Sequence, residues 1–338
     1  MKPDGNWKRW LNTKAWWYAS QRLDYGVFLP LMARLPLRWA YRLAQWRGAF
    51  NARYARDWAE MSVGQPYIGQ LCAASFRTMR PDITEDQVHE LVTQRYQTVA
   101  REELDAMFAI QGRMHDLYID LAPARAAMSQ RTKGRGLVVV MGHFDSVFLG
   151  LIAMARCGHC VHLMTSDIVV DDRVHPTIRR YFRTKYQRYE NYMGGGRLLP
   201  TSTPTREFFY DALAHGGIVV VATETPAAPQ PEKGTWVSWF GKRRKMADSA
   251  VRMAIDTGSE IMAMSSKLVR PGVFEWAGSE IVDPKAFVQL DPSTARERVY
   301  APLARFMEHA IGSEPGRWWA SHLLNEFAVD DAAQQPTA

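Results

Sequence analysis

The stretch Gly136-Leu-Val-Val-Val-Met-Gly-His143-Phe-Asp145-Ser-Val-Phe-Leu is the part of this chain that decides its fold. Leu137 to Val140 form an apolar, β-branched run that is typical of a buried strand. A glycine, a histidine and an aspartate follow, and apolar residues then resume as at the start of a helix. Loops that leave the carboxyl ends of strands converge on one crevice in open α/β sheets. The stretch therefore favours an enzyme, with His143 as a candidate general base.

Strand and helix signals alternate on either side of this stretch. Apolar runs predict strands at 137–141, 161–164, 217–223 and 261–265. Helical patterns lie between them at 148–155, 205–214 and 247–257. This alternation favours an α/β fold, with a central sheet flanked by helices. We expect one such domain over residues 61–327, followed by a disordered tail at 328–338.

Composition is that of a globular protein. The chain has 338 residues, of which 47% are hydrophobic and 23% charged, so it can bury a sizeable core. No signal peptide is visible, and three cysteines are too few for a disulfide framework, which favours a reducing compartment. The segment Cys157-Gly-His159-Cys160-Val-His162 runs from a helix into a strand, so its side chains diverge. We expect no metal site there.

Residues 1–60 form a separate segment, which is basic and rich in tryptophan. They contain eleven Lys and Arg against four acidic residues, and seven of the twelve tryptophans. Indole rings among basic side chains suit an anionic membrane surface. The least polar stretch, 25–33, is far shorter than the roughly 20 residues that span a bilayer. We therefore expect helices that lie on the membrane, as a peripheral or monotopic segment.

Two other interpretations fit the same segment. Nucleic acid is disfavoured as a partner because no helix-turn-helix, zinc-finger or RNA-stacking signature accompanies the charge. The other is an amphipathic helix that packs on the protein's own core with its arginines in solvent. Pro36 marks the start of a helix that runs toward Trp58, and Thr84 caps a second long helix.

In these residues the chain resembles the late acyltransferases of lipid A biosynthesis, within the lysophospholipid acyltransferase superfamily. The run around His143 is similar to the first motif of that family. Five other stretches resemble the family and occur in its order, and the resemblance covers residues 26–327. Two precede His143: the basic segment 38–47 and the stretch 75–86 before a long helix. Three come after it: a helix, turn and strand at 211–224; a turn and helix at 239–257; and a closing Trp-rich helix at 315–322.

The resemblance implies an O-acyltransferase at the cytoplasmic face of the inner membrane. Family members move a fatty acyl group from an acyl carrier protein or acyl-CoA thioester to a hydroxyl of a lipid or glycolipid. His143 would deprotonate that hydroxyl, and a carboxylate would orient the ring and stabilise its charged form. Backbone N–H groups of the turn after the strand are candidate donors to the tetrahedral oxyanion. The reaction needs no metal or other cofactor.

The chain departs from the family where that carboxylate is expected. The position five residues after the histidine is Phe148, which accepts no hydrogen bond. Asp145 is the nearest substitute, although it also suits a helix N-cap. Glu224, at the family's later acidic position, is the other candidate. We therefore expect either Asp145 or Glu224 to pair with His143.

Three further features concern the substrate. The family's arginine after the next strand is absent, and Arg173 is the nearest later candidate. The long segment 171–196 ends in three glycines and is either a lid over the cleft or a surface insertion. The basic run 242–245 is either a solvated loop or a docking site for an acidic carrier protein or phospholipid headgroups.

Two alternatives to lipid A-like acyl transfer stay open. One is transfer to another envelope, capsule or pigment acceptor. The other is a catalytically weakened homologue that binds acyl lipid or carrier protein as an accessory factor. The replacement by Phe148 favours the accessory factor, and the retained His143 and Glu224 favour an enzyme.

Overall fold

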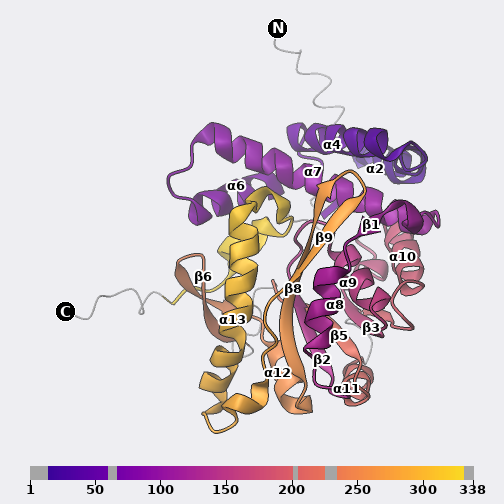
Figure 1. Ribbon diagram of the computed structural model, residues 1–338. Coiled ribbons are helices and arrows are strands. Elements are labelled where there is room, and N and C mark those ends of the chain that lie inside the picture. Colours follow the sequence, from indigo (N-terminus) through magenta and orange to yellow (C-terminus); the bar gives the residue numbers. More distant parts are fainter. Residues whose placement is uncertain (1–13, 60–66, 201–204, 225–233, 331–338) are drawn as a thin grey trace.

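The computed structural model describes residues 14–59, 67–200, 205–224 and 234–330 (Figure 1). In these residues a seven-stranded mixed sheet has the order β1-β9-β8-β2-β5-β3-β4. The strands are β1 (Tyr118–Ile119), β2 (Leu137–Met141), β3 (Val161–Thr165), β4 (Leu198–Pro200), β5 (Ile218–Ala222), β8 (Glu260–Arg270) and β9 (Val273–Gly278). Helices cover both faces, so the predicted α/β fold with a central sheet flanked by helices is confirmed.

β2 occupies the centre of this sheet. It pairs in parallel with β5 on one side and β8 on the other, so that Leu137 faces both Ile218 and Glu260. All five residues of β2 are buried, as expected for a parallel strand covered on both faces. β9 runs antiparallel to β8, a hairpin that the sequence did not predict. The residues after β2 therefore emerge at the middle of the carboxyl edge.

Two layers of helices enclose the sheet (Figure 1). One face is covered by α8 (Ala122–Ser129), α9 (Val147–Arg156) and α10 (Pro176–Glu190). The other is covered by α11 (Arg206–Ala214), α12 (Ser249–Thr257) and α13 (Pro292–Ser313), with the hairpin β6 (Thr235–Trp239) and β7 (Lys242–Met246). Each predicted strand and crossover helix is found within a few residues of its expected bounds.

The long helix α7 (Glu85–Ile110) joins the N-terminal helices to the sheet domain. It begins with a capping box in which the Thr84 side chain accepts from the backbone of Gln87, confirming the predicted cap. The N-terminal elements are α2 (Lys14–Leu23), η1 (Asp24–Phe28), α3 (Leu29–Met32) and α4 (Leu37–Arg53), and α6 (Ile68–Met79) follows. α4 lies so close to α7 that a Cβ on Gly48 would sit 2.4 Å from Cα of Gln97.

The inner face of α7 carries acidic side chains that are buried and hydrogen-bonded. Burial without a partner would cost several kcal/mol per charge, so each carboxylate is matched by donors. The pairings are Glu102 with Lys185, Glu103 with Arg47 and Tyr25, and Asp105 with the hydroxyls of Tyr41 and Ser146. They connect α4 and α10 to the loop after β2.

Most of residues 171–196 form helix α10, in which Lys185 and Tyr189 are buried, and the short turn η3 (Asp167–Val169) precedes the segment. Two of the three glycines at the segment's end pack closely against the start of β3: a Cβ on Gly194 would lie 2.3 Å from the carbonyl oxygen of His159, and one on Gly196 would lie 1.8 Å from that of Val161. They allow a tight approach between backbones, which favours the surface insertion over the lid.

The basic run at 242–245 is strand β7 rather than a solvated loop. The Arg244 side chain is buried and donates to the carbonyl of Leu324 at 2.9 Å. Residues 328–330, expected in the disordered tail, add to this strand through a bond from Lys245 N–H to Ala328 O at 2.9 Å. Residues 331–338 lie outside the described part of the chain.

Four turns complete the described chain: η2 (Met114–Asp116), η4 (Pro284–Phe287), and the closing pair η5 (Pro315–Arg317) and η6 (Ser321–Glu326). The predicted Trp-rich helix at 315–322 is therefore wrong, because these residues form short 3-10 turns. Searching the described residues for a helix long and apolar enough to cross a bilayer finds none.

Candidate active site

The loop after β2 presents His143 at the carboxyl edge of the sheet. Main-chain pairing holds it there, since Trp319 N–H donates to His143 O at 3.1 Å and Phe144 bridges to Trp318. Gly142 precedes the histidine because a Cβ at this position would lie 2.4 Å from Oε1 of Glu224. The glycine thus lets a carboxylate approach the loop.

His143 and Glu224 form a hydrogen-bonded pair. The Nδ1 atom of His143 lies 2.9 Å from Oε2 of Glu224, and the same oxygen accepts the His143 backbone N–H at 2.6 Å. The other oxygen accepts Nε1–H of Trp318. The carboxylate is 1% exposed and the imidazole 34% exposed. With its Nδ1 proton held by a carboxylate, the neutral ring carries its lone pair on Nε2.

The approach of Glu224 follows from the sheet. β5 pairs with β2, and Thr223 N–H donates to Met141 O at 3.2 Å, so the next residue falls beside Gly142. Glu224 lies 81 residues from His143 along the chain. The prediction that a carboxylate pairs with His143 is confirmed for Glu224.

Asp145 faces away from the ring and anchors the loop instead. Its carboxylate is fully buried and accepts from Nη1 of Arg317 at 2.6 Å and from Leu268 N–H at 2.9 Å. Nη2 of Arg101 lies 3.5 Å away. Asp145 has φ of 48°, a left-handed conformation that aspartate tolerates better than most residues. The N-cap of α9 is Ser146, so Asp145 is not the cap either.

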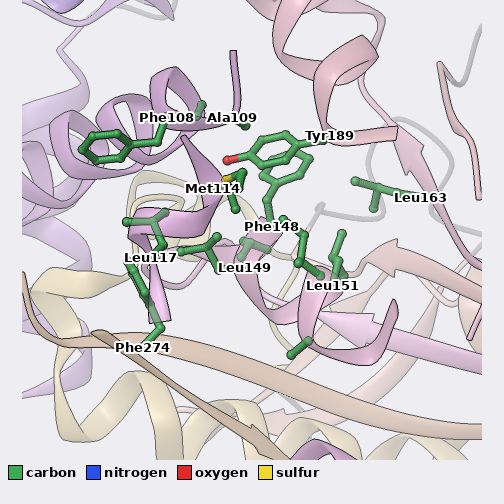
Figure 2. Close-up of a cluster of buried hydrophobic side chains, with 14 of the residues drawn as sticks. Phe108, Ala109, Met114, Leu117, Phe148, Leu149, Leu151, Leu163, Tyr189 and Phe274 are labelled. Carbon is green, nitrogen blue, oxygen red and sulfur yellow. The ribbon is translucent and has the colours of Figure 1, made fainter. Parts of the chain in front are cut away.

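Phe148 belongs to the apolar layer under α10 (Figure 2). Its ring stacks on Tyr189 with centroids 4.4 Å apart and planes at 5°, and Nζ of Lys185 lies 4.4 Å from its centroid. A carboxylate here would lie in this layer, where its charge would lose hydration. The aromatic residue therefore fits its surroundings without contributing to the His143 pair.

Aromatic and basic residues that sequence reasoning missed surround the pair. The ring of Trp319 meets that of His143 edge-on at 4.3 Å between centroids. Nε of Arg95, on α7, donates to Trp319 O at 3.0 Å. Burial lowers the pKa of the nearby His322 to about 4, so its ring is neutral near pH 7. In the sequence, only the run Trp-Trp-Ala-Ser-His at 318–322 indicated that these residues lie near the site.

The N–H groups of the loop are already engaged. Those of His143, Phe144 and Asp145 donate to Glu224, Gly142 O and Arg317 O respectively. The expectation that this turn supplies oxyanion donors is therefore wrong for these three groups.

Other sequence candidates lie elsewhere. Arg173 is 70% exposed at its side chain and pairs with Asp171 at 2.7 Å. Cys160 Sγ lies 3.3 Å from Nε2 of His162, near the start of β3. Among the described residues, no group of three or more His, Cys, Asp or Glu side chains is placed to hold a metal ion.

A pocket of about 610 Å3 lies between α7 and the end of α13. It is lined by Arg101 and Arg317, which also hold Asp145, but by neither His143 nor Glu224. It therefore adjoins the anchor of the loop rather than the imidazole.

The outer surface of the N-terminal helices is apolar and basic. Eight of the fourteen exposed large hydrophobic residues found in the described chain lie between positions 18 and 50. Trp39 is 48% and Trp46 61% exposed, and the guanidiniums of Arg38 and Arg42 lie 5.9 and 5.8 Å from the Trp39 ring. The inner face packs on α7, as the amphipathic-helix alternative predicted, while the outer face keeps its aromatic rings in solvent.

No protein-family model matches this chain, and no curated protein sequence matches it either.

Proposed function

We propose that this protein is an acyltransferase that moves a fatty acyl group from an acyl-carrier-protein or acyl-CoA thioester to a hydroxyl of a membrane lipid or glycolipid. The observation that carries the proposal is the pairing of the accessible His143 imidazole with the buried Glu224 carboxylate. An alcohol becomes a good nucleophile when a base removes its proton, and a carboxylate that fixes the tautomer of an imidazole prepares it for that role. The residue pattern that resembles the lipid A acyltransferases supplies the substrate class.

The proposed reaction uses the imidazole as its only proton carrier, with the carboxylate as its electrostatic partner. Nε2 of His143 takes the proton of the acceptor hydroxyl as its oxygen attacks the thioester carbonyl. Glu224 stabilises the imidazolium that forms. The tetrahedral intermediate then breaks its carbon–sulfur bond, and the leaving thiolate takes the proton back from Nε2. The products are an ester and a free thiol, with the enzyme unchanged.

The N-terminal helices support a lipid acceptor at an anionic membrane surface. Trp39 and Trp46 project from α4 beside several arginines, on the face opposite α7. Indole rings at the headgroup level and cations near anionic lipid would hold the protein at the cytoplasmic face of the inner membrane. We expect the wild type and the control variant Trp236→Ala to float with anionic vesicles, and the double variant Trp39→Ala/Trp46→Ala to lose flotation. Equal flotation of all three proteins would contradict the proposed membrane surface.

A second candidate function is an accessory factor that binds acyl lipid or carrier protein without turnover. One observation favours it: the N–H groups of His143, Phe144 and Asp145 already have acceptors, which leaves them unable to bind an oxyanion without rearrangement. The enzyme remains the better-supported function because an accessory factor does not need an accessible imidazole paired with a buried carboxylate.

A transfer assay separates the two. The full chain is mixed with acyl carrier protein thioester or acyl-CoA and a set of lipid and glycolipid acceptors in vesicles, and mass spectrometry follows thiol release and ester formation. We expect turnover by the wild type and at least a 1,000-fold loss, on the order of a general base and its partner together, in His143→Ala. His89→Ala, at an exposed position on α7, is the matched control. Equal turnover in His143→Ala would overturn the mechanism.

A further inference from the structure

A second pocket lies on the other face of the sheet, where α11, α12 and α13 meet. Its volume is about 460 Å3, and three of its lining side chains are guanidiniums. They come from three different helices, so the tertiary fold brings them together: Arg206 on α11, Arg252 on α12 and Arg296 on α13. We call this cavity the Arg252–Arg296 pocket.

Two of these guanidiniums are held by one buried carboxylate. Asp248 is 2% exposed, and its side chain accepts Nε–H of Arg252 at 2.8 Å, while Nε of Arg296 lies 3.3 Å from its other oxygen. The hydroxyl of Thr235 also donates to Asp248 at 3.0 Å. Arg252 is thus oriented by a hydrogen bond from Nε, whereas Arg296 lies at ion-pair distance from Asp248 and its buried Nε makes no hydrogen bond. In the described part of the chain, their Nη groups make no hydrogen bond.

This arrangement prepares both side chains for an anion. A guanidinium that is fixed at Nε presents its two Nη groups as a rigid fork, and that fork matches the oxygens of a phosphate. Because Asp248 already orders the side chains, binding costs less rotamer entropy than it would at free surface arginines. The two guanidiniums share one carboxylate, so the pair keeps a net positive charge.

The remaining acid of the pocket is neutralised within it. Asp256 lies 3.6 Å from Nη2 of Arg206 and accepts the hydroxyl of Tyr210 at 2.7 Å. It therefore does not cancel the charge of the Arg252 and Arg296 pair. The first turns of α11 and α12 add to the positive potential, since neither helix has a side-chain cap on its N–H groups.

The pocket and the His143–Glu224 pair lie toward the same edge of the sheet. Met164, near the end of β3, and Ser249, the first residue of α12, both line the pocket, so it opens at the carboxyl edge. Tyr300, on α13, interacts with acidic residues of both sites. Its hydroxyl donates to Ala247 O at 3.3 Å, and it lies close enough to Asp248 and Glu224 for both carboxylates to raise its pKa, after burial.

We infer that the Arg252–Arg296 pocket binds the phosphate group of a substrate, with the forks of Arg252 and Arg296 as its ligands. The inference deepens the proposed function and rests on it only for which substrate carries the phosphate. Two sources share this chemistry. One is the phosphopantetheine arm of the thioester donor, and the other is a phosphorylated acceptor lipid.

Calorimetric titrations of the full-length protein test the inference. The probes are 4′-phosphopantetheine, pantetheine, which lacks the phosphate, and glycerol 3-phosphate as the soluble headgroup of a phosphorylated lipid. Arg252→Gln and Arg296→Gln each remove one fork. Arg298→Gln, at an exposed position two residues further along α13, is the matched control.

We expect at least one phosphate-bearing probe to bind the wild type and Arg298→Gln with the same affinity. Its affinity for Arg252→Gln and for Arg296→Gln should be lower by roughly tenfold or more. Arg296→Lys, which keeps the charge without the fork, should fall between. If the binding of 4′-phosphopantetheine depends on these arginines, the pocket belongs to the thioester donor. If the binding of glycerol 3-phosphate depends on them, the pocket belongs to the acceptor lipid. The melting temperature of each variant shows whether the fold is intact.

Binding of both phosphate probes that is unchanged in the two pocket variants, or as tight for pantetheine as for 4′-phosphopantetheine, would overturn the inference. Absence of phosphate binding by the folded wild type would also overturn it. His143→Ala should retain phosphate binding, so a failure of acyl transfer and a failure of the phosphate site are distinguishable.

Discussion

Two buried carboxylates flank the loop after β2, and they do different things. Asp145 lies two residues from His143 in sequence, yet it binds Arg317 and the backbone of Leu268. Glu224 lies 81 residues away and binds the imidazole. The comparison teaches that the partner of a carboxylate at a strand end is set by strand pairing and by the turn of the loop rather than by closeness in the chain.

The donors around each carboxylate explain which one suits catalysis. Asp145 is neutralised by a guanidinium, with a second one 3.5 Å away. Glu224 receives neutral donors, the His143 N–H and the Trp318 indole, in addition to the imidazole. Its negative charge therefore stays available to stabilise a proton on His143, whereas that of Asp145 is already matched.

The largest expected effect is the loss of acyl-transfer rate when the negative charge of Glu224 is removed. Glu224→Gln keeps the size of the side chain but cannot stabilise an imidazolium, so we expect kcat for acyl transfer to fall by roughly 100- to 10,000-fold. Asp145→Asn, measured at a temperature where the variant is folded, should lose less than tenfold in kcat. Steady-state rates of both variants check the comparison, and similar losses would break it.

The second effect is on stability and should have the opposite order. Asp145→Asn removes the buried anion of Arg317 and leaves it only the partly exposed Glu314, so we expect the free energy of unfolding to fall by about 3 kcal/mol. Glu224→Gln keeps one accepting oxygen and turns its NH2 group toward a donor, either the Trp318 indole or the His143 N–H groups. It leaves no guanidinium without its buried anion, so it should cost less. Urea denaturation of the two variants measures the difference. A larger loss for Glu224→Gln would contradict the anchoring role of Asp145.

A third carboxylate, Asp105, sharpens the comparison through its pH dependence. It accepts from Ser146, next to Asp145, and burial raises its pKa to about 8, against about 3.9 in an unfolded chain. Between these values the folded state holds a proton that the unfolded state has released, so stability falls as the pH rises from about 4 to 8. Asp105→Asn should flatten that fall, as measured by urea denaturation at pH 5 and pH 8.

Asp82→Asn, at an exposed site before α7, is the control for this titration and should follow the wild type. An unchanged slope in Asp105→Asn would show that another group causes the fall.

Much of the framework could be read from the sequence because it depends on local patterns. β2 and β5 are continuous apolar runs, which are typical of parallel strands covered on both faces. The cap at Thr84 is a pattern within four residues. The loop with His143 was identified in the same way, from a strand followed by small and polar residues.

The rest depends on contacts between distant segments. Asp145 and Glu224 could not be ranked, since the direction of Asp145 follows from its positive φ and from Arg317, 172 residues away. The buried charges of α7 resemble those of a solvated helix face in sequence. Three glycines at 194–196 suggested mobility, whereas Gly194 and Gly196 pack closely against residues 159–161 at the start of β3. Each of these three features depends on a partner that lies far along the chain.

The most direct test of the central claim is to observe the Nδ1 proton of His143 by NMR in protein carrying 15N-labelled histidine. We predict that neutral His143 carries its proton on Nδ1 in the wild type and in Asp145→Asn, because Glu224 holds it there. Glu224→Ala should lose this protected proton signal. A signal that survives in Glu224→Ala and disappears in Asp145→Asn would contradict the assignment of Glu224 as the partner of His143.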